Sequence, residues 1–157
     1  MTTLLKSATI IDTSSPFHLQ IKDILIVNGT ITEIEDHIPE KKEYTTCKRD
    51  NLHVSIGWFD TSVSFGEPGY EERETLANGL LTASKSGFTA IAVHPNTNPV
   101  TDHKAAVEFL KHKVRDSATE LYPIGALTQG SLGQEMAELY DMQQSGAIAF
   151  GDYNKPI

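Results

Sequence analysis

The fold is decided by residues 74–93, which read ETLANGLLTASKSGFTAIAV. Three apolar residues between positions 74 and 85 recur at helical spacing and would share one face of a helix: Leu76, Leu80 and Ala83. Gly87 then stands where the end of a helix favours glycine. Residues 88–93 form a short apolar run that is typical of a buried strand. A helix that leads directly into such a strand predicts one crossover unit of a parallel sheet.

The same alternation extends to both sides of this stretch. Further strands are predicted at residues 58–63, 121–127 and 147–150. One additional helix begins after Asp102, a residue type that caps helices, and has one apolar face: Ala106, Phe109 and Leu110. Another is predicted at residues 134–145, with Gly146 as its cap and one apolar face: Met136, Leu139 and Tyr140. The resulting order, β-α-β-α-β-α-β, predicts a parallel sheet with crossover helices.

Each of these predicted strands runs into polar sequence rich in glycine or proline at its carboxyl end. α/β proteins place their binding and catalytic groups at that edge of the sheet, so we expect a site there. Four such strands are half of an eight-stranded barrel, which takes about 250 residues. The spacing alone leaves two possibilities, a small open sheet or the first half of a larger barrel.

Residues 1–55 follow a different pattern, of short strands joined by turns. Strands are predicted at residues 4–11, 23–27 and 30–34. Asn28-Gly29 lies between the last two and is a strong signal for a hairpin. Residues 35–50 are highly charged, and we expect them to form a solvated loop. The chain is therefore expected to divide into a β segment at residues 1–55 and an α/β segment at residues 56–157.

The charge balance narrows the classes of partner. The 157 residues include 13 Lys and Arg against 21 Asp and Glu, so the formal net charge is 13 − 21 = −8. An acidic chain repels nucleic-acid phosphates and anionic lipids, and no apolar stretch approaches the ~20 residues of a membrane span. The single cysteine, Cys47, cannot form an internal disulfide. A reducing compartment fits this, and a cytoplasmic location is expected.

Several motifs at the predicted strand ends resemble those of one enzyme family. They are Gly57-Trp58-Phe59-Asp60, Glu67-Pro68-Gly69-Tyr70-Glu71, Gly87-Phe88-Thr89, Pro95-Asn96-Thr97-Asn98-Pro99-Val100-Thr101-Asp102, Tyr122-Pro123-Ile124-Gly125-Ala126 and Gly146-Ala147-Ile148-Ala149-Phe150-Gly151-Asp152. In this order and at these intervals they resemble the amino-terminal half of dihydroorotases, which are cyclic amidohydrolases of the amidohydrolase superfamily. The resemblance implies an α/β fold, the first half of a (β/α)8 TIM-like barrel preceded by a small β-sandwich segment.

The resemblance also implies an activity and a cofactor. Enzymes of this family interconvert carbamoyl aspartate and dihydroorotate in pyrimidine biosynthesis. Their zinc polarises the amide carbonyl and turns bound water into a nucleophile at neutral pH. A His-x-His pair at the end of the first barrel strand supplies the first metal ligands, and an Arg two residues later holds the substrate carboxylate.

This chain departs from the family pattern at all three of those positions. The two histidine positions are Ser62 and Ser64, and the arginine position is Gly66. A neutral hydroxyl is a poor zinc ligand beside imidazole, and glycine offers no charged hydrogen bond to a carboxylate. We therefore expect zinc to be absent or weakly bound, and the chain to be a catalytically degenerate member of the family.

Two other positions of the family pattern are kept. Asp152 matches the carboxylate that bridges the metals, although an aspartate there also suits a turn or a helix cap. Asn96 matches an asparagine that helps to bind the substrate carboxylate, although it also suits a turn within Pro-Asn-Thr-Asn-Pro. His94 ends a predicted strand and is either a hydrogen-bonded packing residue or a ligand at the strand end.

Three hypotheses follow for the function. The first is a degenerate dihydroorotase homologue that acts as a non-catalytic partner, by resemblance a partner of aspartate carbamoyltransferase. The second is an active zinc-dependent dihydroorotase whose ligands lie outside this chain or at unusual positions such as Asp152 and His94. The third is an inactive fragment. Because a half-barrel exposes two parallel edges, we also expect a homo-oligomer or pairing with the missing half of the barrel.

Overall fold

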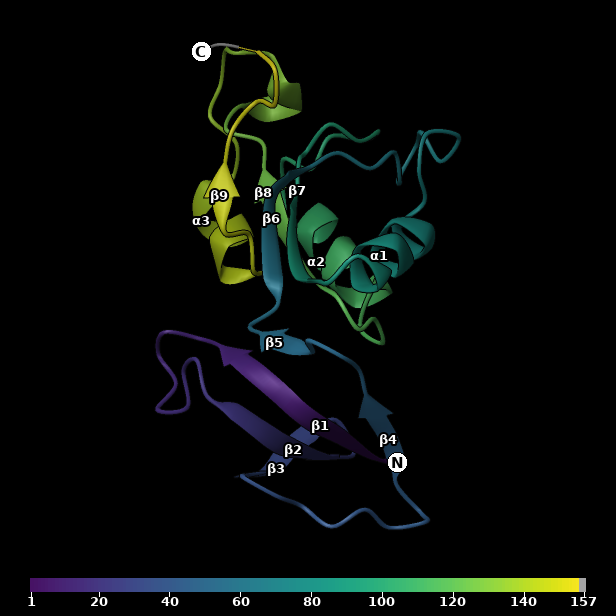
Figure 1. Ribbon diagram of the computed structural model, residues 1–157. Helices are drawn as coiled ribbons and strands as arrows, with labels where there is room; N and C mark the ends of the chain where they lie inside the picture. Colours follow the sequence, from purple (N-terminus) through teal and green to yellow (C-terminus); the bar gives the residue numbers. More distant parts are fainter. Residues whose placement is uncertain (156–157) are drawn as a thin grey trace. The chain divides into compact units, whose positions relative to one another are not determined.

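The computed structural model describes residues 1–155 (Figure 1). The chain forms two compact units, one from Met1 to Ile56 and another that starts at Gly57. Each unit has its own sheet and its own buried apolar clusters.

The N-terminal unit is a five-stranded sheet in the order β3-β2-β1-β4, with β5 also paired to β1. Its strands are β1 (Thr2–Ile11), β2 (Ile21–Val27), β3 (Thr30–Glu35), β4 (Thr45–Lys48) and β5 (His53–Ser55). The β2–β3 hairpin turns at Asn28 and Gly29, whose φ angles of 50° and 82° are those of a two-residue hairpin turn. The predicted hairpin is confirmed. A sandwich consists of two packed sheets; residues 1–56 form one sheet, and the predicted β-sandwich stays a prediction.

The expectation of a solvated loop throughout residues 35–50 is wrong in two places. β4 lies inside this segment and pairs in parallel with β1, with Thr45 beside Thr3 and Lys48 beside Lys6. Ile38 is buried and joins an apolar cluster of this unit. The free edge of β1 offers backbone hydrogen bonds to any extended segment. Such pairing uses backbone groups, so the charged side chains of residues 35–50 do not reveal it.

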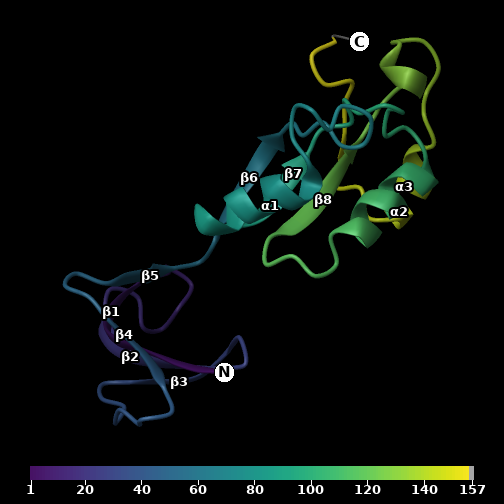
Figure 2. The same ribbon diagram turned by 90° about the vertical axis from the view of Figure 1, so that its right-hand side faces the viewer.

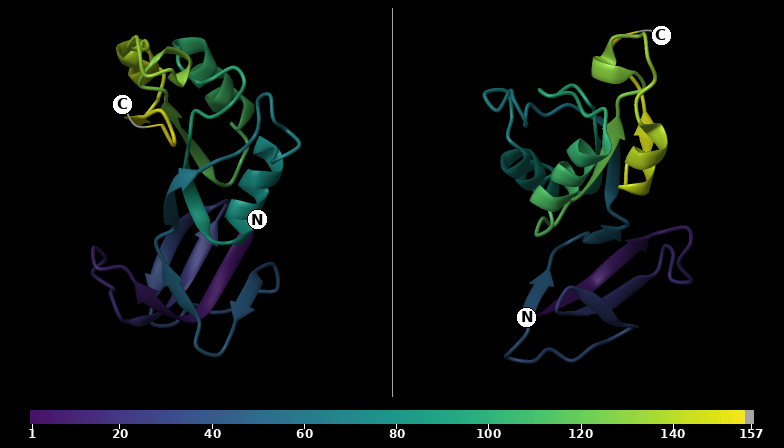
Figure 3. Two further views of the ribbon diagram at one scale, coloured as in Figure 1. Left: turned by 90° about the horizontal axis from the view of Figure 1, so that it is seen from above. Right: turned by 180° about the vertical axis from the view of Figure 1, so that it is seen from behind.

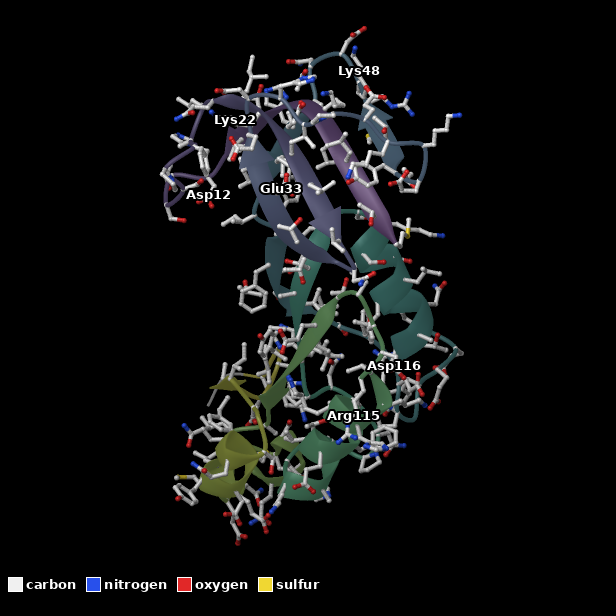
Figure 4. All side chains as sticks on the ribbon, turned by 90° about the horizontal axis from the view of Figure 1, so that it is seen from below. Asp12, Lys22, Glu33, Lys48, Arg115 and Asp116 are labelled. Carbon is white, nitrogen blue, oxygen red and sulfur yellow. The ribbon has the colours of Figure 1, made fainter. Side chains whose placement is uncertain are left out.

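A buried ion pair lies within the same sheet. Lys6 on β1 pairs with Asp23 on β2, and both side chains are almost fully buried. The Asp23 carboxylate also accepts the backbone N–H groups of Ser7 at 2.8 Å and Ile38 at 2.9 Å. Burial acts to raise the pKa of Asp23, but the hydrogen bonds and the Lys6 charge outweigh it and lower that pKa. Lys22, labelled in Figure 4, instead pairs with an exposed carboxylate at 2.6 Å, that of Asp36.

The second unit is built on a parallel sheet in the order β6-β7-β8-β9 (Figure 1). Its strands are β6 (Trp58–Val63), β7 (Phe88–Val93), β8 (Glu120–Gly125) and β9 (Ala149–Phe150). Its helices are α1 (Leu76–Lys85), α2 (Lys104–Lys113), α3 (Leu139–Gln144) and the short 3-10 helix η1 (Gln129–Ser131). The strands and α-helices alternate, which confirms the α/β class and the parallel, curled half-barrel sheet. None of the helices formed by residues 1–155 has the length and apolar content that a bilayer span requires.

The helices α1 and α2 pack on one face of this sheet (Figure 2). The main buried cluster joins both helices to β7 and β8 and consists of Phe65, Leu76, Leu80, Ile91, Val93, Leu110 and Leu121. The predicted apolar face of α1 is thereby confirmed. Gly79 allows α1 to pack closely against the Phe65 ring, because a Cβ at that position would lie 2.3 Å from it. Gly87 has a φ of +88°, as the predicted left-handed end of the helix requires.

The opposite face of the sheet carries aromatic side chains. Phe59 lies beside Ala90 in the register, and Tyr122 lies beside Ala92, so all four are on the face away from Ile91. The rings of Phe59 and Tyr122 meet edge to face with centroids 5.9 Å apart. Phe59 is 47% exposed. Within residues 1–155, this face is therefore only partly covered.

The second helix differs from its prediction in both cap and face. α2 begins after His103, and the Asp102 carboxylate does not cap it but accepts the Gly130 N–H at 2.7 Å. The residues of α2 that are buried are Val107 and Leu110, whereas Phe109 is 43% exposed. Asp102 therefore joins two loops at the strand ends, a role that a capping pattern cannot reveal.

The third helix is much shorter than predicted. α3 covers only Leu139–Gln144, and Met142 is its buried residue. Met136 and Tyr140 are 67% and 73% exposed, so the predicted apolar face is wrong. The preceding segment instead forms a bridge between Met136 and Thr128, which holds it in an extended conformation. Gly146 ends the helix with a φ of +107°, as predicted.

The four strands run in one direction, so their carboxyl ends meet at one edge of the sheet. The loops that follow them gather there, at the top of Figure 1 and of Figure 3, right. The predicted site residues all lie at this edge or just after it.

Candidate functional site

The end of β6 supplies Ser62 and Ser64. Val63 between them pairs with Val93 on β7 and packs on the helix-covered side. Because side chains alternate along a strand, the two hydroxyls point to the other side. Asp60 fixes this strand end, since its carboxylate accepts the backbone N–H of Ser62 at 3.0 Å.

Ser62 meets His94, the residue that follows β7. The Ser62 Oγ lies 3.0 Å from the His94 Nε2. The backbone N–H of His94 donates to the Val63 carbonyl at 2.9 Å, which anchors the two strand ends to each other. Burial lowers the pKa of His94 below its ordinary value of 6.5, so the neutral imidazole is favoured near neutral pH. His94 is thus a hydrogen-bonded residue at the site edge.

Ser64 meets Asn96 two residues farther along. The Asn96 Nδ2 donates to the Ser64 Oγ at 2.8 Å. The Asn96 Oδ1 is buried and has no hydrogen-bond partner in the described part of the chain. The Arg73 guanidinium donates to the backbone carbonyl of Asn96 at 3.4 Å and stacks on the Tyr70 ring. Asn96 therefore lies within the strand-end cluster, and its role in binding a carboxylate stays a prediction.

Gly66 occupies a position with no room for a side chain. A Cβ there would lie 1.7 Å from the backbone oxygen of Tyr70. The turn is closed by the Tyr70 N–H, which donates to the Gly66 carbonyl at 2.9 Å, and by the Gly66 N–H, which donates to the Glu74 carbonyl at 3.0 Å. An arginine at this position would require a different path for the loop.

Glu67 fixes the start of α1. Its carboxylate is buried, accepts the backbone N–H of Leu76 at 2.8 Å and pairs with Lys113 at the end of α2. An acceptor at a helix N-terminus satisfies an otherwise free donor and complements the helix dipole. Glu67 therefore supports the loop that carries Ser64 and Gly66.

Asp152 follows β9 and faces the loop after β8. Its carboxylate accepts the backbone N–H groups of Leu127 at 2.9 Å and Thr128 at 3.0 Å, and it also bonds the Thr128 hydroxyl. Burial acts to raise the pKa of Asp152, but these hydrogen bonds and the charge of Lys155 lower it overall. Tyr153, the next residue, reaches the cluster instead, with its ring centroid 4.9 Å from that of His94. The metal-bridging role of Asp152 stays a prediction.

A hollow of about 500 Å³ borders these residues. Asn96, Asp152 and Tyr153 lie along it, together with Tyr70, Arg73 and Lys155. Tyr70 belongs to the motif at residues 67–71, whereas no motif marks Arg73 in the same loop or Lys155 after β9, and the sequence pattern gives no signal for these two. A larger hollow of about 1050 Å³ is lined by Thr89 and Glu120 at the start of β7 and β8. It lies at the other edge of the sheet, away from the end where α/β proteins place their chemistry.

The donors present at the strand ends do not fit a zinc site by themselves. Zinc sites in proteins use three or four His, Cys or carboxylate ligands. Across residues 1–155, no three such side chains stand close enough together to hold a metal ion. The cluster at β6 and β7 offers two hydroxyls and a single imidazole, that of His94.

Comparison with known proteins places these features in a family. The sequence model of the family described as Dihydro-orotase-like matches residues 53–156. The dihydroorotase of Pelotomaculum thermopropionicum is 38% identical over 157 residues, which cover 100% of this chain and 36% of that protein. The dihydroorotase of Ruminiclostridium cellulolyticum is 34% identical over 158 residues, again 100% of this chain and 36% of that protein. The chain thus spans little more than a third of these relatives' length.

Solved structures show the same fold. The L-hydantoinase (dihydropyrimidinase) of Arthrobacter aurescens superposes with a TM-score of 0.75 and 20% identity, over 94% of this chain and 32% of that one. A dihydroorotase crystal structure superposes with a TM-score of 0.64 and 13% identity, over 95% and 41%. These proteins are TIM-barrel amidohydrolases, so the sheet β6–β9 corresponds to part of such a barrel.

Proposed function

The chain belongs to the dihydroorotase-like family, and we propose that it is a member without the family's zinc-dependent ring chemistry that acts as a folded, non-catalytic partner. The reaction that we propose is lost is the one that the family resemblance implies, the interconversion of carbamoyl aspartate and dihydroorotate. The residues at the end of β6 supply the argument that this chain does not perform it.

The observation that carries the proposal is the pair of hydroxyls at Ser62 and Ser64. The two side chains stand where a pair of imidazoles would grip one ion, and both are already hydrogen-bonded, to His94 and Asn96. Neutral hydroxyls compete poorly with imidazole for zinc. Two strong ligands are therefore missing from the part of the site that this chain contains.

Gly66 supports the same conclusion for the substrate. The family's arginine would hold a carboxylate through two parallel hydrogen bonds. The turn at Gly66 leaves no space for any side chain. The loss of this group is thus built into the backbone of the loop and does not depend on one side chain alone.

The proposed partner is either aspartate carbamoyltransferase, by analogy with the family, or the other half of a barrel, supplied by more of the same polypeptide or by a second copy. β6 and β9 are the end strands of the sheet. End strands present unpaired backbone groups that favour association, and the exposed Phe59 on the partly covered face adds apolar surface. A cytoplasmic location belongs to this proposal.

Two measurements on the purified protein test the loss of chemistry. Zinc is quantified by plasma mass spectrometry, and ring closure of carbamoyl aspartate is followed by the appearance of dihydroorotate. We expect zinc far below stoichiometric and no ring closure above a protein-free blank. Stoichiometric zinc together with ring closure would overturn the proposal in favour of an active zinc enzyme with ligands at other positions.

The partner is tested separately by size-exclusion chromatography. The purified protein is run alone and with purified aspartate carbamoyltransferase. Co-elution supports that enzyme as the partner, and an oligomer of the chain by itself supports pairing between copies. A monomer that binds neither itself nor the enzyme contradicts the partner role.

A further inference from the structure

We propose that Ser62 and His94 form a nucleophile–base pair that reacts with small activated acyl compounds, such as esters and thioesters, without a metal. The pair lies where the family pattern has its first metal ligand, and its chemistry differs from the family's. The inference goes beyond the scaffold role proposed above, that of a non-catalytic partner, where non-catalytic refers to the zinc-dependent ring chemistry of the family alone.

The geometry is that of an activated hydroxyl. The 3.0 Å separation between the Ser62 Oγ and the His94 Nε2 is within hydrogen-bond reach, as a nucleophile and its general base require. The two residues lie 32 positions apart in sequence and end neighbouring strands. The bond from the His94 N–H to the Val63 carbonyl holds these strand ends together. The pair is therefore set by the sheet and not by a flexible loop.

The environment of His94 suits the role of a base. A histidine can take a proton at Nε2 only when that nitrogen is unprotonated, with the ring proton on Nδ1. Partial burial disfavours the charged imidazolium and leaves the neutral ring available. The Tyr153 ring packs against the imidazole at a centroid distance of 4.9 Å and limits its rotation.

The serine is open to a reactant. Ser62 is exposed in the described structure, so an acyl compound can approach its hydroxyl from solvent. The hollow of about 500 Å³ is lined by Asn96, two residues after His94 in the sequence, and by Tyr153, whose ring packs against His94. It provides room for the acyl group or for the leaving group of a small ester.

The reaction can be written with its atoms in balance. The Ser62 Oγ bonds to the carbonyl carbon, and the hydroxyl proton passes to the His94 Nε2. The bond from that carbon to the leaving oxygen or sulfur breaks, and the leaving group takes the proton from His94. Water then attacks the acyl-serine ester and releases a carboxylic acid, while the Ser62 oxygen recovers a proton through His94. No oxidant, reductant or metal is consumed.

Ser64 provides an internal comparison. It lies two residues from Ser62 at the same strand end, but its Oγ bonds the Asn96 amide at 2.8 Å. An amide does not act as a base near neutral pH, so Ser64 has no group to take its proton. The structure therefore predicts selective reaction at Ser62.

The test is covalent labelling of the purified, chelator-treated protein. A fluorophosphonate, which traps base-activated serines, is added, the label is located by mass spectrometry, and the release of p-nitrophenol from p-nitrophenyl acetate is followed in parallel. We expect one label on Ser62. Ser62→Ala should abolish labelling, and His94→Gln should slow it about 100-fold, the contribution typical of a general base.

Controls separate loss of reactivity from loss of structure. Ser84→Ala removes a half-buried serine of α1 whose hydroxyl donates to the Leu81 carbonyl, and labelling should be unchanged. Thermal melts show whether each variant is folded. If His94→Gln does not fold, the site of labelling and the Ser62→Ala result still decide the question. Labelling at Ser64 or elsewhere, no labelling of the folded protein, or equal rates in Ser62→Ala would overturn the pair. The scaffold role is tested by zinc content and ring closure, which are measured separately from the labelling. Failure of this inference can therefore be distinguished from failure of the scaffold role.

Discussion

The carboxylate of Asp152, beyond the last strand, accepts the backbone N–H of Leu127 in the loop after β8 at 2.9 Å. Together with the bonds from Thr128, this contact ties the two final strand ends of the sheet to each other. Asp152 is only 3% exposed. Its structural role can therefore be measured apart from any role toward a metal.

Asp152→Ala should destabilise the protein by roughly 2–4 kcal/mol, because buried donors that bond a charged carboxylate in the unmodified protein lose their acceptor. Urea unfolding measures the change. Asp116→Ala, at an exposed carboxylate labelled in Figure 4, is the matched control and should change little. An unchanged unfolding midpoint in Asp152→Ala, accompanied by a fall in bound zinc, would assign Asp152 to a metal instead.

The buried pair of Lys6 and Asp23 predicts a pH dependence. An unfolded aspartate titrates near 3.8, and the folded pKa of Asp23 lies below that value. The stabilisation is therefore complete above the unfolded pKa and is lost as the pH falls through the folded pKa. Hydrogen exchange of the β1 and β2 amides across this range measures it. Asp23→Asn should reduce protection at neutral pH and weaken the acid dependence.

The control for the Asp23 experiment is Asp36→Asn. Asp36 pairs with Lys22 but its side chain is 89% exposed, and such pairs contribute little. Its exchange profile should follow that of the unmodified protein. Equal effects of the two substitutions would contradict the assignment of the acid sensitivity to the buried pair.

Gly66→Ala should destabilise the second unit by about 1–3 kcal/mol, the range for side chains forced into filled space. The added Cβ would meet the Tyr70 oxygen at 1.7 Å, so the turn must shift. Gly151→Ala is the control, because nothing lies within 4 Å of a Cβ there. Thermal melts of the two variants settle the point, and equal melting temperatures would show that the turn at Gly66 adapts freely.

The double substitution Ser62→His and Ser64→His should raise zinc affinity at least tenfold. Alternate strand positions bring the two new imidazoles to the face that already holds His94, and imidazole is a good zinc ligand. Titration with zinc in the presence of a colorimetric chelator measures the affinity. The single variant Ser84→His, on α1 and outside the strand-end cluster, should bind no better than the unmodified protein.

Much of the fold follows from short-range patterns in the sequence. α1 could be predicted from the spacing of Leu76, Leu80 and Ala83, and its end from Gly87. Both signals lie within the helix or next to it, so they can be read without knowing the rest of the fold. Such short-range patterns predict the segment before α3 wrongly. The bridge between Met136 and Thr128 holds it extended despite the helical spacing of Met136 and Tyr140. The pairing of β4 with β1 is likewise long-range and carries no local signal.

The candidate site shows the same division. The positions of Ser62 and Ser64 at the end of β6 could be predicted from the motif around Asp60. The contact of Ser62 with His94 could not, because it depends on the register of β6 against β7. Nor could the lack of space at Gly66, which arises from the path of the backbone at Tyr70.

The central claim is that two hydroxyls replace the imidazoles that would hold zinc at the end of β6. Anomalous diffraction at the zinc edge, from crystals soaked in a modest excess of zinc, tests it most directly. We predict no anomalous peak within coordination distance of the Ser62 or Ser64 Oγ. A peak at full occupancy beside both hydroxyls would contradict the account.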